Sequence, residues 1–127
     1  MGIITEYSGS FIEDSKRGLF KVRDPWSGHV RLLPAIRKTF NSANILEVTA
    51  ATTGPCGGDA GHGCRVAVRF NDLGGTVIKA RTIPESTEGN GGADLLLAGD
   101  WELYTLIEGL RFAADALEAL SRESNNT

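Results

Sequence analysis

The segment TTGPCGGDAGHGCR, residues 52–65, brings together residue types that can do chemistry. It contains five glycines, two cysteines, an aspartate and a histidine. No other stretch of the chain has this composition. Three kinds of chemistry suit these residues: binding a metal ion, binding an anion, and nucleophilic or acid–base catalysis.

Zinc is the first possibility, because Cys56, Asp59, His62 and Cys64 form the pattern C-x2-D-x2-H-x-C. Thiolate, imidazole and carboxylate groups all bind zinc. Structural zinc sites usually combine a short knuckle with a second ligand pair from a distant segment, whereas these four residues lie close together in one loop. We therefore expect no metal ion and no cofactor. A disulfide across the base of the loop is disfavoured in a reducing compartment.

Anion binding is the second possibility, because glycines let successive N–H groups converge into a concave surface. Arg65 follows the loop directly. Arg69 lies four residues further on, on the same face of the expected strand. Lys79 and Arg81 would join them if the strand that carries them pairs with this one. Neither the P-loop pattern nor the dinucleotide-binding pattern is present. The expected ligand-binding residues are Gly57, Gly58, Asp59, Gly61, His62, Gly63, Arg65, Arg69 and Arg81.

Catalysis is the third possibility. Cys56 or Cys64 with His62 could act as nucleophile and base, and Asp59 with His62 could act as an acid–base pair. The sequence supplies no third group to orient either pair. We therefore expect no catalytic residues and favour a binding protein over an enzyme.

Short strands and turns are expected to position the loop. Alternating or β-branched residues predict strands over 3–12, 19–23, 45–53 and 65–70, a strand over 76–83 antiparallel to the one before it, and a strand over 94–98. Residues 30–40 are ambiguous because Pro34 interrupts them. Val66, Val68 and Phe70 should share one face of their strand, opposite Arg65, Ala67 and Arg69. Polar and glycine-rich segments predict turns or loops over 13–18, 24–28, 71–75 and 84–92.

A long helix should follow, starting at Asp100 as its N-cap. The stripe expected to lie on the sheet is Leu103, Leu106, Ile107, Leu110, Ala113, Ala114, Leu117 and Leu120. The solvated face comprises Glu108, Arg111, Asp115, Glu118 and Arg122, with i,i+4 pairs 111–115 and 118–122. A further apolar face carries Trp101, Tyr104, Phe112, Ala116 and Ala119. This extra face indicates a second contact, with either the N-terminal segment or another subunit, and we expect a homo-oligomer formed through this helix.

Length and composition predict one domain of the α+β class, an antiparallel sheet with one long C-terminal helix on one face. Within its 127 residues we expect N-terminal strands and turns over 1–44, a β-meander over 45–98 and the helix over 100–123. The net charge of −3 argues against bulk nucleic-acid binding. No apolar run reaches the length of a membrane span, and the chain starts without a secretory pattern. We therefore expect a cytoplasmic protein with no membrane partner.

The loop motif T-G-x-x-G-G-D-A-G-H-G-x-R, the turn DLGGT and the segment GDWELYTLIEGLRFA resemble a group of small, largely uncharacterised proteins of bacteria and their phages. The resemblance covers residues 45–120. It implies an α+β fold and emphasises Gly57, Gly58, Asp59, Gly61, His62, Gly63 and Arg65, without requiring cysteine at positions 56 and 64. It implies no settled activity.

The residues and this resemblance together favour a non-catalytic protein that sequesters a small anionic signalling ligand of nucleotide type, for example a cyclic nucleotide. Phage proteins that sequester host immune signals (sponges) suit this size and chemistry, by analogy of class. Such a protein would act in the host cytoplasm, and an aromatic residue such as Trp26 or Tyr104 could stack on a base. One alternative is a phage-type inhibitor that blocks a host effector through its surface. The second alternative is a small hydrolase that uses His62 and Asp59.

Overall fold

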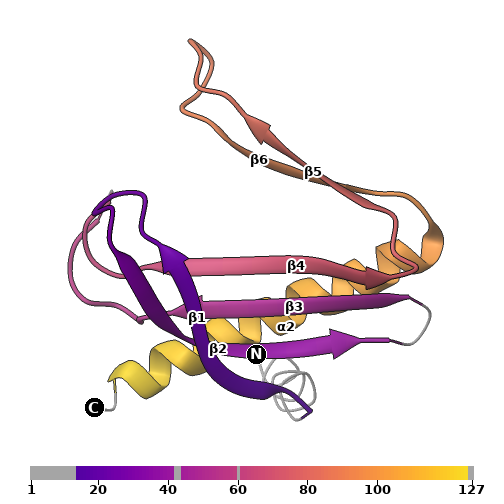
Figure 1. Ribbon diagram of the computed structural model, residues 1–127, viewed down its shortest axis with the longest axis horizontal. Helices are drawn as coiled ribbons and strands as arrows, with labels where there is room; N and C mark the ends of the chain where they lie inside the picture. Colours follow the sequence, from indigo (N-terminus) through magenta and orange to yellow (C-terminus); the bar gives the residue numbers. More distant parts are fainter. Residues whose placement is uncertain (1–13, 42–43, 60, 126–127) are drawn as a thin grey trace.

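The computed structural model describes residues 14–41, 44–59 and 61–125 of the chain. The fold is α+β, as predicted, and consists of a four-stranded antiparallel sheet, a separate two-stranded sheet and one C-terminal helix (Figure 1). The predicted strand over residues 3–12 lies outside the described residues. The elements are β1 (Lys16–Arg23), β2 (Val30–Phe40), β3 (Ile45–Thr52), β4 (Val66–Gly74), β5 (Ile78–Ile83), β6 (Gly92–Leu97) and α2 (Asp100–Asn125).

The main sheet has the strand order β1-β2-β3-β4. Residues 30–40, ambiguous by sequence, form one strand because Pro34 pairs with Leu19 of β1 while pairing with β3 begins only at Ala35. The missing N–H of Pro34 therefore interrupts no ladder on the β3 side. The turn predicted over residues 13–18 is wrong from Lys16 onward. There the backbone pairs with residues 35–37 of β2, and this pairing outweighs the local polar composition.

The β1–β2 hairpin curves out of the plane of the sheet and crosses the face opposite the helix (Figure 1). A small apolar cluster lies beneath it, formed by Leu33, Ala35 and Ala51 with Phe20, Val22 and Ala67 around them. Because these residues come from all four strands, they hold the end of the hairpin over the start of β4. This curvature brings the turn at residues 24–28 to the glycine-rich loop.

The main core lies between α2 and the other face of the sheet, under β2 and β3. It contains Ile36, Phe40, Leu46, Val48, Ala50, Phe112, Ala113, Ala116 and Leu120. Phe70 of β4 packs against this core while Ala67 packs on the opposite side. The predicted division of β4 into two faces is therefore confirmed for Phe70 and Ala67.

The helix is rotated relative to the predicted stripe. Leu103 and Leu110, expected on the sheet, are 53% and 51% exposed, whereas Phe112 is fully buried. The rotation follows from Gly109, where an added Cβ would lie 3.1 Å from Val48 Cγ2. This glycine lets the helix approach β3, and Thr105 on the same side donates a 2.6 Å hydrogen bond to Asn44 Oδ1. Hydrophobic periodicity misses such a face because its centre is a glycine and a threonine.

Other details of the helix also differ from expectation. Leu103 N–H donates to Gly99 C=O, so Gly99 occupies the N-cap position and Asp100 is the first helical residue. Asp115, expected on the solvated face, is buried. The predicted ion pair between Glu118 and Arg122 is present. No helix in the described part of the chain is long and apolar enough to cross a membrane.

The predicted pairing of residues 76–83 with β4 is wrong. The predicted turn over 71–75 instead extends β4, because Asn71, Asp72 and Gly74 pair with residues 45–47 of β3. β5 then pairs only with β6. The two strands form a ribbon, called the arm below (residues 78–97), that leaves the end of the main sheet and projects away from it (Figure 1).

Candidate functional site

Asp24, in the turn between β1 and β2, is the centre of a buried ionic cluster. Its side chain is 1% exposed. Oδ1 accepts hydrogen bonds from the backbone N–H groups of Trp26 (2.8 Å) and Ser27 (3.3 Å), so the carboxylate shapes its own turn. Oδ2 accepts from Arg65 Nε at 2.7 Å and from Arg31 Nη1 at 3.3 Å. The cluster therefore joins the first hairpin of the fold to the start of β4.

The environment keeps the Asp24 carboxylate ionised. Burial alone would raise its pKa, but the hydrogen bonds from Trp26, Arg65, Ser27 and Arg31 together outweigh burial and lower the pKa far below its usual value. Arg23 also donates to Gly28 C=O in the same turn. Two guanidinium groups thus pair with the Asp24 carboxylate, and a third, from Arg23, braces the backbone of the same turn.

Trp26 belongs to the turn, and its side chain lies against the glycine-rich loop and is 67% exposed. The Arg65 guanidinium lies 5.1 Å from the centre of its ring. On another side, a Cβ added to Gly61 would lie 3.3 Å from Trp26 Cδ1, so the loop backbone packs directly on the indole. A large aromatic surface is held in place here and is still open to solvent.

A pocket of about 230 Å³ opens beside this ring. It is lined by Val22, Asp24, Pro25, Trp26, Leu33, Arg65, Val66 and Ala67. Its volume lies below the range of about 300–1,000 Å³ that is usual for pockets holding whole drug-sized ligands. The pocket, called the Trp26 pocket below, is suited to a planar fragment the size of a nucleobase rather than to an entire nucleotide.

The glycine-rich loop is shaped by its five glycines, all of which have positive φ values. Gly58 and Gly63 are in close contact, because a Cβ on Gly63 would lie 2.7 Å from Gly58 O. The loop closes on itself at this point. Within residues 53–59 and 61–65, the N–H groups of Gly57, Gly58, Gly61 and Gly63 have no hydrogen-bond partner. They remain available as donors to an anion.

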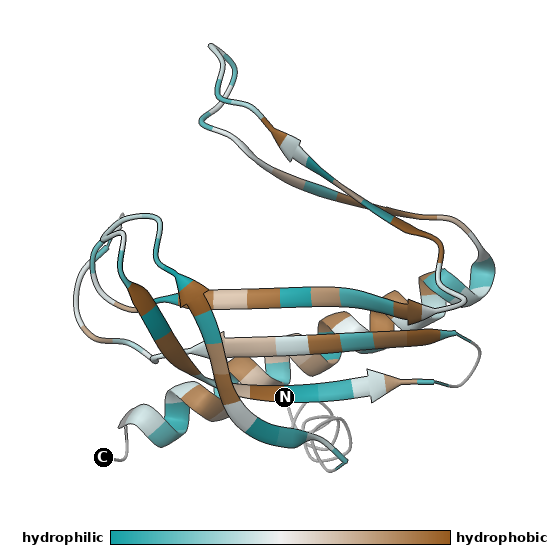
Figure 2. Cartoon of the chain, in the orientation of Figure 1, coloured by the Kyte–Doolittle hydropathy of each residue, from teal (hydrophilic) through white to brown (hydrophobic). Residues whose placement is uncertain are grey.

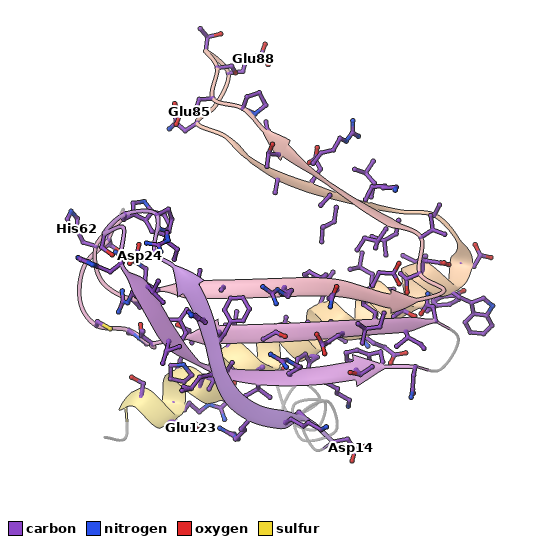
Figure 3. The ribbon with its side chains drawn as sticks, viewed as in Figure 1. Asp14, Asp24, His62, Glu85, Glu88 and Glu123 are labelled. Atoms are coloured by element: carbon purple, nitrogen blue, oxygen red, sulfur yellow. The ribbon has the colours of Figure 1, made fainter. Side chains whose placement is uncertain are left out.

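The cysteines and the histidine of the loop do not form a metal-binding group. In the described parts of the chain, no three His, Cys, Asp or Glu side chains lie close enough together to hold a metal ion. Cys56 and Cys64 are free thiols, and Cys56 Sγ donates to Gly54 C=O. His62 and Asp59 are joined by a backbone hydrogen bond of 3.1 Å and are both exposed. Figure 3 shows His62 and Asp24 at the same end of the sheet.

The predicted cations are only partly brought together. Arg65 lies at the site, but its side chain is 14% exposed and donates to Asp24, Gly63 C=O and Cys64 C=O. Arg69 lies further along β4 with its guanidinium 4.7 Å from the centre of the Phe20 ring. Arg81 is on the arm, opposite Asp94 of β6, and the structure does not bring it to the loop. Lys79 is also on the arm.

Sequence reasoning missed the structural role of Asp24 and Arg31. The motif Asp-Pro-Trp-Ser-Gly predicts a turn, and the structure confirms it with a 2.7 Å hydrogen bond from Gly28 N–H to Asp24 C=O. Nothing local, however, reveals that the aspartate is paired with an arginine 41 residues away. The sequence alone makes Trp26 one of two residues that could stack on a base. Its position at the centre of this turn is the signal that could have singled it out.

In comparisons with protein families, curated proteins and solved structures, this chain matches none of them.

Proposed function

We propose that this chain is a non-catalytic binding protein for a small anionic ligand of nucleotide type. The base would enter the Trp26 pocket and stack on the indole, and the phosphate would bind at the glycine-rich loop. One observation carries this proposal: a fixed, exposed tryptophan and an apolar pocket lie directly against a loop with unpaired backbone donors. Planar bases and phosphates require these two kinds of surface side by side.

The electrostatics around the pocket also support an anion. Two arginines, Arg31 and Arg65, pair with the one buried carboxylate of Asp24, and Arg23 lies in the same turn. Arg65 acts in this proposal as a positioning residue, since it holds the ring of Trp26 and the turn of Asp24. The direct contacts to phosphate would come from loop N–H groups and the exposed His62.

The biological role that we propose is sequestration of a nucleotide signal in the cytoplasm, as phage sponge proteins do. The hydrolase alternative receives no support from the described residues, because His62 and Asp59 make only a backbone contact with each other. The inhibitor alternative would place the binding surface outside the Trp26 pocket and would need no nucleotide.

Nucleotide retention tests the proposal directly. We expect native mass spectrometry of the full chain, incubated with a panel of cyclic and linear nucleotides, to show at least one intact nucleotide retained. Retention of none of them would contradict the proposal. A bound species of altered mass would reveal catalysis and favour the hydrolase.

Replacement of Trp26 by alanine should weaken binding of the retained nucleotide by roughly 10- to 100-fold, because base stacking on an aromatic side chain contributes on the order of 1–3 kcal/mol. Trp101 is the matched control, since it is a tryptophan of similar exposure, 64% against 67%, at the start of α2. Titration calorimetry should show unchanged affinity for Trp101→Ala. Equal affinities of the two variants would place the base elsewhere.

The loop is tested by two glycines that both have positive φ values. Gly63→Ala should reduce nucleotide affinity at least about 10-fold, because its Cβ would collide with the Gly58 carbonyl and force the loop open. Gly57→Ala adds a Cβ with nothing within 4 Å and should change affinity by a much smaller factor. Calorimetry and circular dichroism together separate a change in the loop from unfolding. Similar affinities for both variants would show that the close contact within the loop does not matter for binding.

A further inference from the structure

The two faces of the arm differ, because the charged side chains of its paired residues all lie on one face and the other face carries none. Side chains directly opposite each other in the ladder share a face, so the pairs 78–97, 80–95 and 82–93 place Ile78, Ala80, Thr82, Ala93, Leu95 and Leu97 together. The other face carries Lys79, Arg81 and Asp94 along with Leu96 and Ile83. Figure 2 shows apolar residues along this ribbon, which lies apart from the main sheet. Isolated two-stranded ribbons are marginally stable in water, so the apolar face needs a cover.

The base of the arm is fixed to the rest of the chain. Val77 N–H donates to Glu102 Oε2, and Ala98 N–H donates to Val77 C=O. Thr76 is buried and donates to Ile45 C=O. The arm is therefore held in a projecting position at the point where it joins β4 and α2. Its apolar face does not fold back onto the body of the same chain, since Leu95 remains 41% exposed.

A second apolar surface lies uncovered on α2. Leu103, Ile107 and Leu110 are 53%, 38% and 51% exposed, and their spacing of four and three residues places them on one side of the helix. We call these three residues the helix strip. The helix packs on β2 and β3 through its other residues. It therefore leaves exposed a strip of the same apolar character as the arm face.

The arm is long enough to cover the helix strip. The six paired residues of each arm strand span about 20 Å, and the helix strip spans about 11 Å.

We propose that two copies of this chain exchange their arms, so that the apolar face of each arm lies on the helix strip of the other copy. A second copy fits better than a different protein, because each copy supplies both an arm and a helix strip. Under two-fold symmetry, each arm then covers the helix strip of the other copy, and no apolar surface of either kind is left exposed. The arm does not suit nucleic acid, since its tip carries Glu85 and Glu88 (Figure 3). This proposal is independent of the nucleotide ligand.

Adjacent leucines on opposite faces of the arm test the exchange. Leu95 and Leu96 are 41% and 42% exposed, but only Leu95 lies on the apolar face. Sedimentation of the full chain over a range of concentrations should show a dimer for the wild type and for Leu96→Ser. Leu95→Ser and Leu110→Ser should each raise the dimer dissociation constant at least about 10-fold, while circular dichroism shows the helix and sheet retained.

Three results would overturn the exchange. A wild-type chain that is monomeric at all concentrations would leave the arm without the proposed partner. Equal weakening by Leu95→Ser and Leu96→Ser would show that the apolar face of the arm is not the contact. A dimer lost in Leu110→Ser but retained in Leu95→Ser would show that the helices meet without the arms.

Discussion

Asp24→Asn should lower the melting temperature by on the order of 10 °C at neutral pH, an expectation based on the cost of breaking a buried charge pair. The amide retains an oxygen that can accept from Trp26 and Ser27 N–H, so the turn can still form. The amide nitrogen, however, replaces the oxygen that accepts from Arg65 and Arg31. Two guanidinium groups, one of them largely buried, then face a donor instead of a carboxylate.

The control for Asp24→Asn is the same substitution at another aspartate of the candidate site, one that is not buried. Asp59 is exposed in the glycine-rich loop, so Asp59→Asn should leave the melting temperature within about 2 °C of the wild type. Differential scanning calorimetry of both variants gives the answer. A similar, small effect of both substitutions would mean that the buried cluster contributes little to stability.

Asp24 also predicts how stability changes with pH. Its pKa in the folded chain is lower than in the unfolded chain, where an aspartate has a pKa of about 3.9. The unfolded state therefore binds the proton more readily, so the contribution of Asp24 is complete above that value and is lost as pH falls below it. The difference in melting temperature between wild type and Asp24→Asn should shrink as the pH is lowered from about 5 to about 2. A constant difference across that range would contradict this origin.

Phe112→Ala should reduce the free energy of unfolding by about 3–5 kcal/mol, the usual cost of truncating a buried phenylalanine. Phe112 is fully buried and packs edge-to-face on Phe40, with ring centres 5.9 Å apart. Its removal leaves a cavity between the helix and β2. This loss is a large fraction of the stability of a typical domain.

Tyr104→Ala is the control for this substitution. Both residues belong to the aromatic face predicted from the helical pattern, yet Tyr104 is 53% exposed. Its truncation should cost about 1 kcal/mol or less. Urea unfolding measures both values, and unchanged m values would show that the unfolded states are comparable. Equal losses would mean that the helix is not rotated as described.

Local patterns predict much of the fold. β3 and the two faces of β4 follow from alternation, and the long helix follows from its periodicity, because each of these signals lies within one element. The rotation of α2 cannot be predicted in the same way. It depends on how closely Gly109 approaches Val48, which is a property of two elements packed together. The separation of β5 from β4 likewise depends on another element. β4 stays paired with β3 until Gly74 meets Ile45, so the predicted turn over residues 71–75 becomes part of the strand.

The candidate site, like the fold, is predictable from sequence only where the signal lies within one segment. The glycines of the loop are recognisable in the sequence, and their positive φ values agree with the expected backbone shape. The turn at Asp24 is recognisable too, but its partnership with Arg65 is not, because no local pattern links residues so far apart. The sequence predicts that Arg65 faces a ligand, whereas the structure shows its donors turned toward Asp24 and the loop backbone. The Trp26 pocket depends on this pairing.

The link between Asp24 and Arg65 has a consequence for the order of folding. Joining residues 41 positions apart carries a loop-closure cost of a few kcal/mol if made in a disordered chain. This entropic cost falls only after the intervening strands β2 and β3 have paired, because their pairing already brings the two residues closer together. The helix can pack on β2 and β3 without the pair. A folding intermediate with the helix and central strands in place would therefore contain the hydrophobic core and still lack the Trp26 pocket, which would form in the final step of folding.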